Sequence, residues 1–125
     1  GPADFARAAL ESVAYQTNDL FTAIAGDGIP VSVVRVDGGM TENNWLMQFL
    51  ADIIDRPVDR PVVRETTALG AAMLALMQSD PSITLDDIAS RWQRDAGFVP
   101  KMDASTRRDL VAGWNLAMQR TLTGC

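Results

Sequence analysis

The chain has 125 residues, of which 47% are hydrophobic and 22% charged, with a formal net charge of −5 and a pI of about 4.5. This balance is typical of a folded domain and excludes a disordered chain, and the acidic charge with scattered arginines argues against a nucleic-acid partner held through phosphates. No apolar run is long enough to cross a membrane, and the absence of histidine removes the commonest general base and metal ligand.

The chain contains a single cysteine, Cys125, which is also its last residue. Because no second thiol is available, no disulfide can form within the chain, and a reducing cytoplasm is the expected location. The chain begins with Gly1-Pro2, which is either the remnant of a cleaved tag or a native loop. No signal-peptide pattern of charged, apolar and small residues is present.

The first two predicted elements are a helix and a strand. Apolar residues that recur every three or four positions predict an amphipathic helix over residues 4–25. Asp4 is its expected N-cap, and Gly26-Asp27-Gly28 followed by Pro30 ends it. Residues 31–36 are β-branched with few polar interruptions, which is typical of a short buried strand.

A second helix and a second strand follow two glycines. The helix is expected to start with Thr41 as its cap and to end at Arg56-Pro57. Residues 58–63 then predict a short strand. Prolines flank this strand, and because proline cannot donate a ladder hydrogen bond, they favour an edge position or a strand end.

Three further helices complete the predicted order. The first, over residues 68–77, is apolar nearly all the way round and therefore belongs inside a larger body. The second reaches about Gln93, and the third carries its buried side on a stripe near the end of the chain. Their expected caps are Thr66 or Thr67, Thr84, and Asp103 or Ser105.

Together these elements define an α/β fold with about two parallel strands and five helices. Two consecutive parallel strands joined by a helix form a βαβ unit, which crosses over right-handed. Sheets usually have about five or six strands, and helices on both faces of a two-stranded sheet would leave apolar surface uncovered. We therefore expect the chain to be the helix-rich part of a larger domain whose further strands lie upstream.

The glycine turn at Gly38-Gly39 is the strongest candidate for a ligand site. It follows the carboxyl end of a parallel strand, where open α/β sheets bind ligands. Two missing side chains let a ligand approach the backbone closely, and the N-terminus of the next helix favours phosphate. Asn43 and Asn44 offer amide groups suited to a purine or a ribose. The stretch therefore predicts a shelf for a nucleotide.

Plainer interpretations stay open for each of these features. Two glycines after a strand also make an ordinary tight turn, and Asp37 fits a turn-capping role. The small residues of Thr66–Ala72 are typical of close helix–sheet packing, and Arg60 and Arg64 of a solvated strand end. Three tryptophans lie on helical stripes and are expected in the core: Trp45, Trp92 and Trp114.

Two common phosphate-binding motifs are absent from the sequence. No GxxxxGK[ST] run occurs, which excludes a P-loop. The run DGGMTENN lacks the third glycine of a dinucleotide-binding turn, which disfavours a Rossmann dehydrogenase.

Three runs read together resemble the C-terminal part of the FGGY carbohydrate kinases: ARAALESVAYQTNDL, VRVDGGMTENNWLMQFLADII and RPVVRETTALGAAMLAL. Residues 98–102 and the run AGWNLAM also resemble the C-terminal tail of that family, so the resemblance covers nearly the whole chain in the right order. Residues 46–49 and 60–72 are more similar to members that phosphorylate glycerol than to the pentulose kinases.

The resemblance implies an actin-like, ribonuclease-H-like ATPase fold in which two domains close over the substrates. In the family the nucleotide lies against the Gly-Gly turn and the helix after it. The resemblance therefore places the phosphate side of the nucleotide at Gly39 and the adenosine side at Asn43, with Gly38 making room beside them. It also implies ATP and Mg²⁺ as cofactors, and transfer of the γ-phosphoryl group to a primary hydroxyl of glycerol.

The resemblance further implies that the catalytic aspartate and the glycerol contacts lie upstream of this segment. We accordingly assign no catalytic residue and no metal ligand within the chain, and expect the isolated chain to be inactive. The expected partners are the small-molecule substrates, with neither nucleic acid nor membrane, and an oligomer or a dimer formed through an exposed apolar face. The alternatives are another sugar or polyol kinase of the family and a non-catalytic scaffold.

Overall fold

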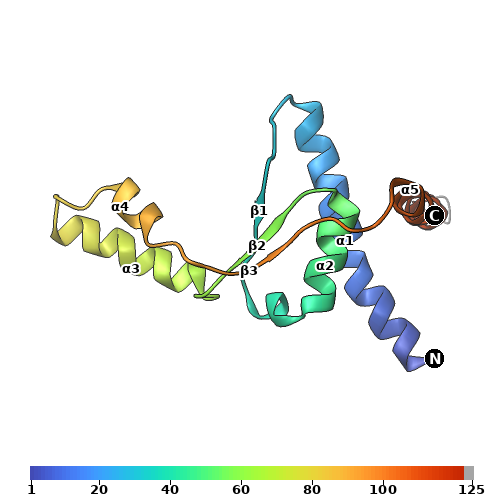
Figure 1. Ribbon diagram of the computed structural model, residues 1–125, viewed down its shortest axis with the longest axis horizontal. Coiled ribbons are helices and arrows are strands. Elements are labelled where there is room, and N and C mark those ends of the chain that lie inside the picture. The colour runs from blue at the N-terminus through green and yellow to red at the C-terminus, as the bar shows by residue number, and fades with distance from the viewer. Residues whose placement is uncertain (123–125) are drawn as a thin grey trace.

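The computed structural model describes residues 1–122, and Cys125 lies outside the described residues. The elements in chain order are α1 (Pro2–Gly26), β1 (Val34–Arg35), the 3₁₀ helix η1 (Gly39–Glu42), α2 (Asn44–Ile54), β2 (Val58–Pro61), α3 (Thr66–Ser79), α4 (Leu85–Ser90), β3 (Arg94–Phe98) and α5 (Ala104–Leu122). In Figure 1 the strands lie in the middle of an elongated molecule, with α1, α2 and α5 at one end and α3 and α4 at the other. The predicted α/β class, with five α-helices in this part of the chain, is confirmed.

The sheet contains three strands in the order β1-β2-β3. β1 and β2 are parallel, as predicted, and are joined by α2. For β2 the prolines predicted an edge position or a strand end. The edge position is wrong, because β3, which was not predicted, pairs with β2 in antiparallel fashion and makes it the central strand. The strand end is confirmed for Pro61, the last residue of β2. β3 has no β-branched residue, so its pairing partner, and not its local propensity, makes it a strand.

Pro61 fits into the central strand because the pairing of β2 and β3 is irregular there. The register shifts between Arg60 and Pro61. A proline removes one ladder hydrogen bond, so it is confined to strand ends and bulges. Pro61 is the last residue of β2 and lies at this irregularity, which reconciles the proline with a central strand.

The first two helix caps differ from those predicted. α1 begins at Pro2 with Gly1 as its N-cap, so Asp4 lies inside the first turn. α2 is capped by Asn43, whose side chain accepts a hydrogen bond from the backbone N–H of Leu46 at 3.1 Å. Thr41 does not cap α2, because the chain first makes the 3₁₀ helix η1. The extra turn moves the start of α2 further along the chain.

The caps of the later helices are partly as predicted. The N-cap of α3 is Glu65, with no side-chain hydrogen bond to the helix, and the Thr66 hydroxyl donates to Asp37 instead. Thr84 caps α4 in a capping box, and α4 ends at Ser90, short of the predicted end. The carboxylate of Asp103 accepts hydrogen bonds from the first residues of α5, as a capping residue does.

The core lies where α2 packs against α1 and the sheet. Tyr15 of α1 and Phe49 of α2 form a T-shaped pair with ring centroids 5.7 Å apart, and Tyr15 stacks on Trp114 of α5 at 5.4 Å. The expectation of three core tryptophans is wrong for Trp45, which is 44% exposed, while Trp92 and Trp114 are half-buried. The buried apolar residues are Ala14, Tyr15, Leu46, Met47, Phe49, Leu50, Ala51, Ile53, Ile54 and Val58.

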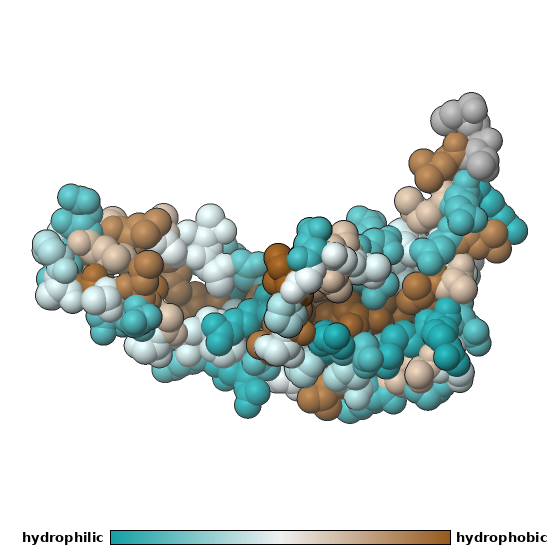
Figure 2. All heavy atoms as spheres, turned by 90° about the horizontal axis from the view of Figure 1, so that it is seen from above, coloured by the Kyte–Doolittle hydropathy of each residue, from teal (hydrophilic) through white to brown (hydrophobic). Residues whose placement is uncertain are grey.

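α3 has no buried residue, although its sequence is apolar nearly all the way round. Leu74 is 63% exposed, and Figure 2 shows brown apolar surface at the α3–α4 end and in the hollow along the middle of the molecule. α3, which was expected to lie inside a larger body, is therefore left uncovered by the other described residues. Among residues 1–122 no helix is both long and apolar enough to cross a membrane.

Candidate functional site

The glycine turn lies between β1 and η1, beyond the carboxyl end of the parallel strand. Gly38 has φ +86° and ψ 167°, a conformation that residues with a Cβ rarely adopt. Gly39 is exposed and opens η1. A Cβ added to either glycine would meet no atom within 4 Å. Gly38 is therefore needed for its backbone shape, and Gly39 leaves the backbone open to an incoming group.

Hydrogen bonds hold the glycine turn in this shape. The N–H of Gly38 donates to the carbonyl of Arg64 at 3.0 Å, which ties the turn to the segment after β2. The carbonyl of Gly38 accepts from the N–H of Thr41 at 3.1 Å and from its hydroxyl at 2.7 Å. Thr41 is only 3% exposed, so water does not compete for these bonds. The turn is thus a fixed shelf and not a loose loop.

Asn43 and Asn44 follow the turn and have different roles. The side-chain oxygen of Asn43 caps α2 by accepting from Leu46, so its NH₂ group is the part that can donate to a ligand. The side-chain oxygen of Asn44 accepts a hydrogen bond from Arg60 at 2.8 Å and faces the protein framework. Both asparagines and Gly39 are exposed, and of the two amides it is that of Asn44 that is held by Arg60.

Arg60 lies beneath the turn, contrary to the expectation of a solvated strand end. It is 8% exposed and donates to the carbonyl of Thr41 and the side chain of Asn44, both at 2.8 Å. Its Nε donates to Asp95 of β3 at 2.8 Å. A signal for this position exists in the sequence, because residues two apart in a strand share a face, and Val58, two residues before Arg60, is fully buried.

Further charged groups surround the turn. The Arg64 guanidinium donates to Glu42 of η1 and lies 3.6 Å from the Asp95 carboxylate. Its Nε is buried without a hydrogen-bond partner. Asp37, just before the glycines, accepts from the hydroxyl of Thr66 at the start of α3. Both arginines and Asp37 therefore connect the turn to neighbouring strands and helices, and the sequence had pointed only to the capping role of Asp37.

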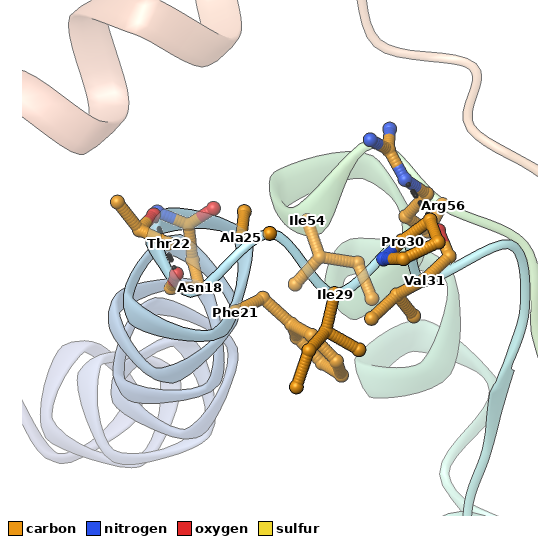
Figure 3. Close-up of a pocket in the computed structure, with 10 residues that line it drawn as sticks. Asn18, Phe21, Thr22, Ala25, Ile29, Pro30, Val31, Ile54 and Arg56 are labelled. Carbon is orange, nitrogen blue, oxygen red and sulfur yellow. Dashed lines mark hydrogen bonds between the residues drawn. The ribbon is translucent and has the colours of Figure 1, made fainter.

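Two hollows in the described part of the chain lie away from the glycine turn. The first, of about 460 Å³, lies between the end of α1, the loop after it and the end of α2. In Figure 3 Phe21, Ile29 and Ile54 gather in its middle, while Arg56 lies at its rim. The second is lined by the start of α1 and by Trp45. Neither hollow includes Gly38 or Gly39, and because a Cβ added at either glycine would meet no atom within 4 Å, the candidate site is an open shelf.

Solved structures with a similar backbone define the class of fold. A ligand-bound xylulose kinase from Lactobacillus acidophilus matches 96% of this chain with a TM-score of 0.79 at 20% sequence identity. At this level of identity the likeness concerns the fold alone. The described α/β unit therefore has the fold found in a carbohydrate kinase.

The sequence identifies the family. A model of the C-terminal domain of the FGGY family of carbohydrate kinases matches residues 1–79. The glycerol kinase of Cereibacter sphaeroides is 54% identical over 124 residues, which is 98% of this chain and 25% of the relative. A crystal structure of Plasmodium falciparum glycerol kinase with ADP is 41% identical over 93% of this chain and 24% of that one, with a TM-score of 0.77. The chain belongs to the FGGY family of carbohydrate kinases, and it spans about a quarter of the length of these relatives.

Proposed function

We propose that this chain is the ATP-binding C-terminal part of a kinase that transfers the γ-phosphoryl group of ATP to glycerol, giving glycerol 3-phosphate. The carrying observation is the 54% identity to a glycerol kinase across nearly the whole chain. The alternative acceptors, pentuloses, have weaker support, because the xylulose kinase of Rhodospirillum rubrum is 24% identical to this chain. The glycerol-specific part of the proposal rests on that difference.

We assign the nucleotide to the shelf formed by Gly38, Gly39 and Asn43. Phosphate groups would lie over Gly39, where no side chain stands in the way, and the adenosine would lie toward Asn43. Gly38 contributes by allowing the turn and by leaving space.

The chemistry divides between this chain and residues outside it. ATP supplies the phosphoryl group, and this chain binds and orients the nucleotide. No carboxylate in the described residues is assigned as the base that receives the glycerol proton. Residues 1–122 also contain no group of three or more His, Cys, Asp or Glu side chains that could hold a metal ion, so we place Mg²⁺ with the ATP phosphates and with ligands elsewhere in the whole kinase.

We further propose a cellular location and binding partners for the whole protein. We place it in the cytoplasm, because the chain has a single cysteine and thus no disulfide framework. Its partners are then ATP and glycerol, without nucleic acid or membrane. The exposed apolar surface of α3 is covered either by the rest of the protein or, in the isolated chain, by a second copy.

The substitution Gly39→Arg in the whole kinase tests the nucleotide site. A side chain over the shelf should raise the KM for ATP at least roughly tenfold, because it occupies the space proposed for phosphate. The matched control is Gly113→Arg on α5, which adds the same side chain at another glycine whose Cβ would meet nothing within 4 Å. An unchanged KM for ATP in a folded Gly39→Arg variant would place the nucleotide elsewhere.

A coupled assay of ADP release tests the division of the chemistry. The whole protein should turn over with glycerol and ATP, while the isolated chain should not. A protein that binds no ATP and phosphorylates no polyol would instead favour the scaffold alternative. A preference for a pentulose over glycerol would favour the pentulose kinase alternative.

A further inference from the structure

Arg60 is the most buried cation in the described residues and is unused by the proposed nucleotide contacts. It lies on β2 and faces the inner side of the glycine turn. Burying a guanidinium is costly unless its donors are satisfied. Its three hydrogen bonds, each 2.8 Å long, therefore mark a site where the structure depends on this side chain.

Two of the three acceptors, Thr41 and Asn44, lie close together in sequence, and the third, Asp95, lies far from them. The carbonyl of Thr41 belongs to η1, and the amide oxygen of Asn44 belongs to the first residue of α2. The carboxylate of Asp95 belongs to β3 and balances the charge. The guanidinium is planar and presents several donors in a fixed fork, so one side chain sets the position of the turn relative to the sheet.

The hydrogen bond from Arg60 to the Thr41 carbonyl connects Arg60 to the glycine turn. Thr41 also holds Gly38 through its N–H and its hydroxyl. Arg60 thus acts on Gly38 through Thr41 and on the N-terminus of α2 through Asn44. Both ends of the candidate nucleotide site, the glycines and the helix start, are tied to one buried cation.

We propose that Arg60 is a positioning residue that fixes the Gly38–Asn44 turn in the shape that accepts the nucleotide, and thereby controls the KM for ATP without touching ATP. This inference rests on the proposed function, because it assumes that the nucleotide lies on the shelf. It predicts an effect on ATP and none on glycerol, since the polyol contacts lie outside this chain.

Arg60→Lys in the whole kinase is the principal test. In Arg60, Nη1 donates to Thr41 and Asn44 while Nε donates to Asp95. Lysine keeps the positive charge, but its single ammonium cannot occupy both nitrogen positions and so cannot hold the turn and β3 at the same time. The KM for ATP should rise roughly tenfold, as expected when a supporting contact is lost, while the KM for glycerol should stay close to that of the wild type.

Asn44→Ala is a second variant, and its folding does not depend on whether the buried position of Arg60 tolerates a substitution. Asn44 is exposed, and the substitution removes one of the three acceptors of Arg60. Its KM for ATP should rise in the same direction by a smaller factor. Arg94→Ala is the control, because Arg94 pairs with Asp59 across the same two strands at 3.4 Å and makes no contact with the turn; it should leave both KM values unchanged.

The outcomes separate this inference from the proposed function. If Gly39→Arg raises the KM for ATP while Arg60→Lys and Asn44→Ala leave it unchanged, the positioning role is wrong and the nucleotide site stands. If Gly39→Arg also has no effect, both fall together. Equal increases in the KM values for ATP and glycerol would show a general structural role and overturn the inference. If Arg60→Lys fails to fold, Asn44→Ala decides.

Discussion

Gly38 and Gly39 are neighbours of the same residue type with different physical requirements. Gly38 has a positive φ of +86°, which costs a residue with a Cβ about 1–3 kcal/mol. Gly39 has no such backbone restriction, and its surroundings are open. The resemblance gave the two glycines different roles at a nucleotide, and these roles stay predictions. The structure adds that the turn requires a glycine at position 38 and that the space beside Gly39 is open.

Alanine substitutions at the two glycines should therefore affect different quantities. Gly38→Ala should lower the free energy of unfolding of the whole protein by about 1–3 kcal/mol because of backbone strain. Gly39→Ala should change it by less than about 1 kcal/mol. Urea unfolding of both variants measures the difference, and equal stabilities would contradict the role given to Gly38.

At the scale of the element, the start of α5 shows how a local sequence sets a helix boundary. The hydroxyl of Ser105, the N–H and hydroxyl of Thr106 and the N–H of Ser105 all donate to the Asp103 carboxylate. The hydrogen bond from the Ser105 hydroxyl is the largest cause that holds the pKa of Asp103 well below its usual value. The cap is therefore strongest when the carboxylate is charged.

The stability contributed by this cap should depend on pH. A carboxyl group whose pKa is depressed in the folded state stabilises the fold above its unfolded pKa of about 3.9, and this contribution is lost as the pH falls through the folded pKa. Asp103→Asn should therefore have a lower thermal midpoint than the wild type near neutral pH. The difference between the two midpoints should become smaller as the pH falls below about 4.

Ser105→Ala provides the companion measurement for the cap. It removes the hydroxyl that contributes most to the lowered pKa while leaving the carboxylate in place. The pH dependence of the thermal midpoint should become shallower in this variant. A gap between Asp103→Asn and wild type that stays constant from neutral to acidic pH would show that charge does not matter at this cap.

At the scale of the whole molecule, both the sheet and α3 lack packing partners within the described residues. The sheet has three strands, below the usual five or six, and α3 buries none of its residues. Exposed apolar patches of this kind mark surfaces that bind other protein. The relatives, about four times as long as this chain, contain ample sequence to cover them.

The isolated chain should consequently self-associate through α3. Light scattering coupled to gel filtration should give a mass above that of one chain, rising with concentration, because burying apolar surface drives association. Leu74→Glu should shift the distribution toward the monomer, since Leu74 is 63% exposed on α3. Leu116→Glu on α5, at a leucine 49% exposed, is the control and should leave the mass unchanged.

The sequence by itself determined most of what depends on neighbouring residues. Helical periodicity and glycine or proline breaks located the five helices and the parallel strand pair, because these signals act within a few residues of each other. The runs around Gly38-Gly39 and Thr66–Ala72 identified the FGGY family, which the comparisons confirm. The roles of Gly38, Gly39 and Asn43 at a nucleotide stay predictions.

Only the tertiary structure decided features that require distant parts of the chain to meet. β3 is a strand because β2 offers it an edge, and Arg60 is buried because η1, α2 and β3 supply acceptors from residues far from it in the chain. Local propensity carries no information about such partners, since a buried polar group or an unfavourable strand sequence is stabilised by whichever segment satisfies its hydrogen bonds. The sequence thus singled out the glycine turn, and the fold revealed what holds that turn in shape.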